Sequence, residues 1–96
     1  MSNDDPAVNE VGAYDEARLD AGMRAFSRND FATALELLLP CAEAGSVRAQ
    51  MLMSRLYYAG NGVPQDMERY AYWLERAAAA GEKSARAKLK RLRTRT

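Results

Sequence analysis

Residue types that carry acid–base, nucleophilic or metal chemistry are sparse in this chain of 96 residues. It has no histidine, the commonest general base, and its single cysteine, Cys41, cannot form a zinc cluster. Cys41 lies on an apolar stripe, and such a thiol is more often a buried structural residue than a reactive nucleophile. The sequence therefore predicts a protein that is not an enzyme and that holds no metal or cofactor.

A glycine pair between two expected helices is the one segment that invites comparison with phosphate-binding loops. Gly60 and Gly62 lack the longer glycine spacing and the lysine that such loops use. Asp66 is the only acid near this segment, and capping of the next helix explains its presence. We therefore interpret residues 60–65 as a structural turn in which the glycines adopt positive φ angles.

Residue types that suit contacts with another protein gather on two expected helices. One set shares the face of the helix over residues 47–59 that lies opposite Leu52 and Leu56. These residues are Met51, Ser54, Arg55 and Tyr58. Methionine adapts its shape, arginine offers a forked donor and tyrosine is amphipathic, so the set predicts a partner-binding surface. The alternative is that Met51 and Tyr58 pack against the first helix of the chain.

A second set lies on the expected helix over residues 67–80. Its members are Arg69, Tyr72, Trp73 and Arg76. We expect Trp73 to belong to the core rather than to a contact surface, since tryptophan is highly buried on average. The other three residues are candidates for partner binding.

Basic residues are concentrated at the C-terminal end of the chain and acidic residues at the N-terminal end. Residues 83–96 hold seven of the 14 lysines and arginines and no acid, whereas residues 1–20 hold six acids and one arginine. Four of the basic residues fall on one face of the expected last helix: Lys83, Arg86, Lys90 and Arg93. The preferred interpretation is a solvated capping helix, followed by binding of an acidic protein surface. Nucleic acid ranks below both, because the segment has no aromatic residue on which bases stack.

Apolar spacing and capping signals predict five helices, which begin near residues 14, 31, 47, 67 and 82. Ser46 and Asp66 are the expected N-caps of the third and fourth helices. Pro40 falls inside the second helix, where it predicts a kink or a break because proline removes a backbone hydrogen bond. The polar segment 1–12 is expected to be disordered.

Several residues recur at an interval of 36 positions, which is typical of helical repeat arrays. The pairs include Gly45 with Gly81, Ala49 with Ala85, and Ala42 with Ala78. Residues 49–85 resemble the Sel-one-like repeat, a branch of the tetratricopeptide-like α-solenoids. The matching residues are Ala49, Gln50, Met53, Tyr57, Gly60, Gly62, Val63, Asp66, Trp73, Ala77, Ala78, Gly81 and Ala85. Ser54 stands where that family usually has glycine, and Tyr70 where it usually has alanine. Because a tyrosine needs more room, Tyr70 predicts wider packing between the helices expected over residues 47–59 and 67–80.

The resemblance implies an all-α fold: a short right-handed α-solenoid of two antiparallel helix hairpins and a C-terminal cap helix. Residues 13–96 would form one domain, with a tetratricopeptide-like hairpin over 13–45, a Sel-one-like repeat over 46–81 and a basic cap helix over 82–96. In related solenoids the first helix of each pair lines the concave surface, so the resemblance places the set around Arg55 and Tyr58 there.

Members of this family are often bacterial adaptors, regulators or scaffolds. The resemblance therefore implies a small bacterial adaptor, regulator or inhibitor that binds one protein or peptide through its concave face. One alternative is a nucleic-acid-associated protein that acts through the basic helix. Another is a self-associating accessory subunit of an enzyme complex, and both monomer and homodimer stay open. We expect a cytoplasmic protein without a membrane segment, because no apolar run approaches a bilayer span and no secretory signal is evident.

Overall fold

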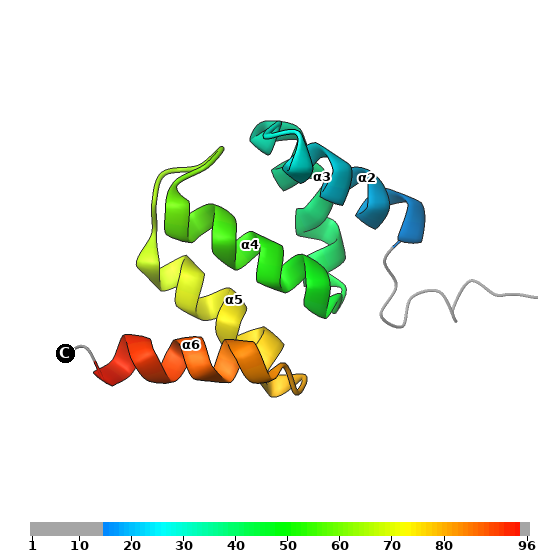
Figure 1. The fold of residues 1–96 in the computed structure, drawn as a ribbon. Coiled ribbons are helices and arrows are strands. Elements are labelled where there is room, and N and C mark those ends of the chain that lie inside the picture. Colours follow the sequence, from blue (N-terminus) through cyan, green and yellow to red (C-terminus); the bar gives the residue numbers. More distant parts are fainter. Residues whose placement is uncertain (1–14, 95–96) are drawn as a thin grey trace, which may run out of the picture.

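Five α-helices make up the part of the chain that this computed structural model describes, residues 15–94, and no β-strand occurs within that range. Their bounds are α2 (Glu16–Ser27), α3 (Phe31–Glu43), α4 (Val47–Ala59), α5 (Met67–Ala79) and α6 (Lys83–Thr94). Each helix packs against the next one along the chain, and α4 lies in the middle of the assembly (Figure 1). The predicted all-α class is confirmed, whereas the expected disordered segment 1–12 lies outside the described residues.

Polar side chains begin α4 and α5 at the positions expected from the sequence. The Ser46 hydroxyl accepts a hydrogen bond from the backbone N–H of Ala49 at 3.1 Å and starts α4 at Val47, as predicted. The carboxylate of Asp66 accepts from the N–H groups of Glu68 and Arg69 at 3.0 and 3.1 Å. Each cap satisfies backbone donors that have no partner within the helix, which is why these starts could be located from the sequence.

Replacing Asp66 with alanine is expected to lower the free energy of unfolding by about 0.5–2 kcal/mol, because two N–H groups of α5 lose their acceptor. Asp66→Asn keeps a capping oxygen but loses the exposed 3.6 Å ion pair with Arg69, so it should cost only a few tenths of a kcal/mol. Urea denaturation of both variants measures the difference. Equal losses in the two variants would assign the effect to charge rather than to the cap.

Pro40 does not interrupt its helix, so the break considered from the sequence is wrong. The α3 helix runs without interruption from Phe31 to Glu43, and the Pro40 ring is exposed. The proline stands close to the end of the helix, and the two residues that follow it, Cys41 and Ala42, are completely buried. Their packing holds the last turn in place despite the missing hydrogen bond.

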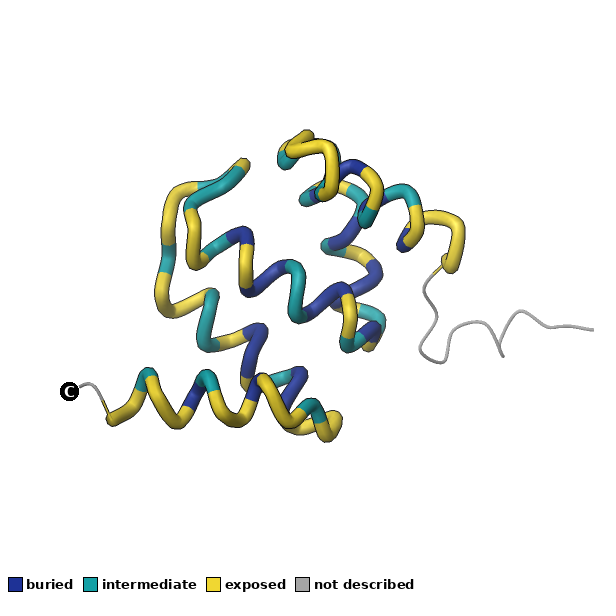
Figure 2. Tube along the Cα trace, viewed as in Figure 1, coloured by how far each residue is buried: buried dark blue, intermediate teal, exposed yellow. Residues whose placement is uncertain are grey.

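The apolar side chains form two adjoining clusters, and α4 contributes to both of them. The first joins α2, α3 and α4, and it includes Leu38, Met53 and, from α5, Trp73. The second joins α5 and α6 around Leu74, with Met51 of α4 packed against it. Buried positions consequently recur along most of α4, whereas α6 is exposed along much of its length (Figure 2). The central helix therefore has neighbours on several sides, while α6 offers an open surface.

Candidate functional site

Two tyrosines from neighbouring helices form the centre of the candidate site. Tyr58, in the last turn of α4, is 49% exposed, and its ring centroid lies 5.0 Å from that of the half-buried Tyr70 on α5. The planes of the two rings are tilted by 46°, so the rings contact each other without stacking face to face. Tyr70, the residue that departs from the usual small side chain of the resembled repeat, thus lies beside Tyr58 at the molecular surface.

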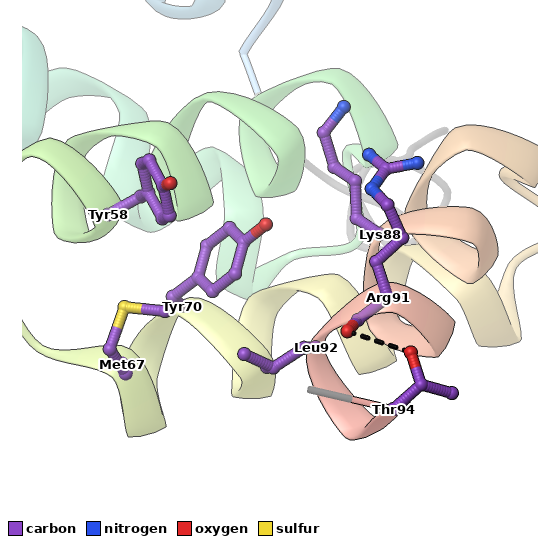
Figure 3. A pocket seen from close by; sticks show the side chains of 7 residues that line it. All are labelled: Tyr58, Met67, Tyr70, Lys88, Arg91, Leu92 and Thr94. Atoms are coloured by element: carbon purple, nitrogen blue, oxygen red, sulfur yellow. Dashed lines mark hydrogen bonds between the residues drawn. The ribbon is translucent and has the colours of Figure 1, made fainter. Parts of the chain in front are cut away.

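Two adjoining hollows meet at this pair of tyrosines, with volumes of about 360 and 520 Å³. Both are lined by Tyr58, Tyr70, Lys88 and Arg91. The smaller hollow continues towards Met67, Leu92 and Thr94 (Figure 3), and the larger continues towards Phe26, Phe31 and Arg55. We call the two hollows together the aromatic–basic groove. Residues from all five described helices therefore meet in this one depression.

At the end of the larger hollow, the groove is lined by two aromatic residues at the junction of α2 and α3, Phe26 and Phe31. The rings of Phe26 and Phe31 meet edge to face, with centroids 5.7 Å apart and planes at 82°. The guanidinium carbon of Arg55 lies 5.2 Å from the centre of the Phe26 ring. Such a cation–π contact restricts the long arginine side chain, so its charge is held at the groove.

The environment of Tyr70 favours the neutral phenol. Burial raises the pKa of Tyr70, and the neighbouring Tyr58 raises it further, whereas the positive charge of Arg91 lowers it in part. The Tyr70 hydroxyl is protonated at neutral pH, as that of an ordinary tyrosine is, so it can both donate and accept hydrogen bonds.

Of the four residues predicted to share a contact face on α4, Arg55 and Tyr58 lie together in the groove. Met51 is half-buried against the cluster between α5 and α6, not against the first helix. Ser54 is completely buried, and its hydroxyl donates to the Met51 carbonyl in a 2.6 Å hydrogen bond. The prediction that the Ser54 side chain reaches a partner is therefore wrong, because α4 has neighbours on both of its sides.

The second predicted set lies on a different surface. Trp73 is only 4% exposed, as expected, and both Tyr72 and Arg76 pack against its indole ring. Arg76 also donates a 3.2 Å hydrogen bond to the Glu43 carbonyl, which ties α5 to the end of α3. Arg69 lies 5.8 Å above the Tyr57 ring, and Tyr72 is 49% exposed. None of the residues of this set lines the groove, so the structure separates the two predicted surfaces.

The basic residues of α6 fall on two faces, a division that the sequence analysis missed. Lys83, Arg86 and Lys90 are exposed away from the groove, and Arg93 pairs with Glu75 at 3.1 Å. Lys88 and Arg91 line both hollows instead. A sequence signal for them existed: Lys88 stands three residues after Ala85 and Arg91 directly before Leu92, so both border the apolar stripe of the helix.

Cys41 is completely buried between the helices of the first cluster. Burial raises the pKa of its thiol, the charge of Arg18 opposes that rise, and the carboxylates of Asp15 and Glu16 add to it. The thiol therefore stays protonated, which disfavours reaction as a nucleophile. Within residues 15–94 no group of three or more cysteine and acidic side chains is arranged to hold a metal ion. In the same range, no helix has the length and apolar character needed to cross a lipid bilayer.

No known family model, no curated protein and no solved structure matches this chain.

Proposed function

We propose that this protein is a binding module of the tetratricopeptide-like α-solenoid type, which holds one protein partner in its aromatic–basic groove. The observation that carries this proposal is the convergence of an exposed tyrosine with three cationic side chains in one depression. Tyrosine and arginine are enriched at the energetic centres of protein interfaces. A module of this kind would act as a small adaptor, regulator or inhibitor.

The order of the helices supports the proposal. Most residues that line the groove come from α2, α4 and α6, which are the first helices of successive pairs in a tetratricopeptide-like array. Phe31 of α3 and Met67 and Tyr70 of α5 also line it. In that arrangement the first helices face the concave side, and the second helices form the outer layer. The last two turns of α4, which carry Arg55 and Tyr58, would then be the surface on which a partner rests.

Site-specific photo-crosslinking tests the proposal with a matched control in the same chain. Tyr58 and Tyr72 are both 49% exposed, but only Tyr58 lies in the groove. With p-benzoylphenylalanine at position 58, we expect a defined protein adduct after irradiation of intact native cells. The same probe at position 72 should give that adduct at least about fivefold more weakly, because a docked partner covers one surface.

Three results would contradict the proposal. A protein adduct that forms only from position 72 would move the interface to the α5 surface. An adduct of two copies of this chain would favour the self-associating accessory subunit. Crosslinks to nucleic acid without any protein would favour the alternative in which the basic helix binds nucleic acid.

A further inference from the structure

The charged residues that line the aromatic–basic groove are all positive. Arg55, Lys88 and Arg91 line it, and no acidic residue is among its lining residues. The ion pairs found within residues 15–94 involve other cations, Arg69 with Asp66 and Arg93 with Glu75. The three groove cations therefore have no carboxylate partner among the described residues, although the chain contains 13 acids.

The cations also converge instead of spreading away from one another. Lys88 and Arg91 are three residues apart on α6, a spacing that brings their side chains together on the helix surface. In Figure 3 they project side by side, and the Tyr70 hydroxyl points towards them. Like charges at this spacing repel each other, and a bound anion relieves that repulsion. The electrostatics of the groove thus favour a negatively charged occupant.

Apolar groups stand beside the cations at both ends of the groove. Met67 and Leu92 line the smaller hollow, and Phe26 and Phe31 line the larger one. Met67 is one of the few large apolar side chains of the described region that is exposed. A fitting occupant therefore carries apolar side chains together with its negative charges.

The aromatic rings distinguish a peptide from a single-stranded nucleic acid. Nucleic acids bind such grooves by stacking bases on free aromatic faces. Here Tyr58 and Tyr70 lie against each other, and Phe26 is contacted by Arg55 on its face and by Phe31. Three of the four groove rings, those of Phe26, Phe31 and Tyr70, are half-buried, and Tyr58 is 49% exposed. Base stacking therefore has less area here than on a row of free rings.

From this geometry we infer that the groove binds an acidic peptide segment of its protein partner, one in which carboxylates alternate with apolar side chains. The carboxylates pair with Arg55, Lys88 and Arg91, while apolar side chains rest on Met67 or on Phe31. Charge-assisted hydrogen bonds from arginine to carboxylate supply orientation as well as affinity. This inference rests on the proposed function, because it names the chemistry of the ligand for the same groove.

Fluorescence anisotropy with two designed probes tests the inference. The acidic probe is a fluorescein-labelled dodecapeptide that repeats Glu-Glu-Leu-Gly, and the neutral probe repeats Gln-Gln-Leu-Gly. Lys88→Gln/Arg91→Gln should weaken binding of the acidic probe about tenfold. Arg86→Gln/Lys90→Gln removes the same charge from the same helix outside the groove and should change the affinity less than about twofold. The acidic probe should also bind more weakly as the salt concentration rises.

The possible results separate failure of the inference from failure of the proposed function. If both probes bind equally and Tyr58→Ala weakens both, the groove remains a peptide site and its preference for carboxylates is overturned. Equal weakening by the two double variants would show that net charge, and not the groove, attracts the probe. Absence of acidic-probe binding at millimolar concentration would overturn the inference outright. A labelled single-stranded DNA that binds through Lys88 and Arg91 in place of the acidic probe would overturn both.

The alternative to a partner peptide is that the acidic N-terminal segment of the same chain occupies the groove, and a charge-neutralised variant tests this alternative. Asp4→Asn/Asp5→Asn/Glu10→Gln in the full chain removes the charge of that segment outside the described residues. If the groove is free to bind a partner peptide, the affinity of this variant for the acidic probe should match that of the unaltered chain within about twofold. The remaining difference would come from the loss of long-range repulsion between the probe and the acidic segment. An affinity for the acidic probe that rises tenfold or more would assign the groove to the N-terminal segment and overturn the inference of a partner peptide.

Discussion

Leu38→Ala is expected to lower the free energy of unfolding by about 2–5 kcal/mol, a loss large enough to unfold much of a domain of this size. Leu38 is completely buried in the cluster that joins α2, α3 and α4. Its removal leaves a cavity that tightly packed neighbours cannot close. Because α2 supplies Phe26 to the groove, loosening this cluster should also reduce ligand binding.

A second substitution shows whether Leu38 and Gly22 interlock as the structure indicates. A Cβ atom at Gly22 would lie 2.7 and 2.8 Å from the Cδ2 and Cγ atoms of Leu38, closer than such atoms can approach. Gly22→Ala alone should therefore lower the free energy of unfolding by about 1–3 kcal/mol through overpacking. The higher helix propensity of alanine offsets up to about 1 kcal/mol of this loss. In the Leu38→Ala background the two closest atoms are gone, although the Leu37 Cβ stays at 3.3 Å, so the same change should become nearly neutral or stabilising.

Chemical denaturation of the four proteins in this cycle measures the coupling. We expect Gly22→Ala to lose most of its destabilising effect, or to stabilise, in the Leu38→Ala background. If Gly22→Ala stabilises the chain that still contains Leu38, then the close approach of α2 and α3 is not maintained in solution. Leu92→Ala, at a half-buried position of α6, serves as a size-matched control and should cost less than Leu38→Ala.

Gly62→Ala is the second substitution with a large expected effect, about 1–3 kcal/mol of destabilisation from its backbone alone. Gly62 has φ +77°, a conformation that residues with a side chain rarely adopt. The added Cβ would also lie 3.0 Å from the Phe31 Cβ and 3.1 Å from its backbone carbonyl group, at the first residue of α3. Backbone atoms of a helix start cannot easily move aside, so the loop itself must shift.

Gly60→Ala provides the comparison, because Gly60 has nearly the same φ, +72°. Its added Cβ would approach Gln65 within the same loop, which can adjust without disturbing α3. We expect Gly62→Ala to be the more destabilising of the two and to weaken binding of the acidic probe as well, since Phe31 lines the groove. Equal costs in thermal denaturation would show that the contact between the loop and Phe31 contributes nothing beyond backbone strain.

The bounds of the central helices could be predicted closely because local chemistry sets them. Ser46 and Asp66 cap the helices that follow, and Gly60 ends α4 in the left-handed conformation. Each signal acts over a few residues and needs no distant partner. The start of α2 was placed less closely. It was expected near residue 14, which lies outside the described range, whereas Asp15 caps a helix that begins at Glu16.

Helix faces were predicted less well where a helix has several neighbours. The face of α4 with Leu52 and Leu56 packs into the core, where Leu56 is completely buried and Leu52 is half-buried. The opposite face was expected to be free, yet Ser54 is buried and Met51 packs towards α5 and α6. A helical wheel shows which residues share a face, but it does not show how many other helices will cover that helix.

The sequence by itself determined the all-α class, the central helix caps and the burial of Cys41 and Trp73, because these depend on side-chain type and on residues close by in the chain. Only the tertiary structure decided that Arg55, Tyr58, Tyr70, Lys88 and Arg91 share one groove. These residues lie on three helices, and their proximity depends on how the helices cross. Crossing geometry is set by the summed packing of many side chains, such as Leu38 against Gly22, and no local signal along the chain encodes it.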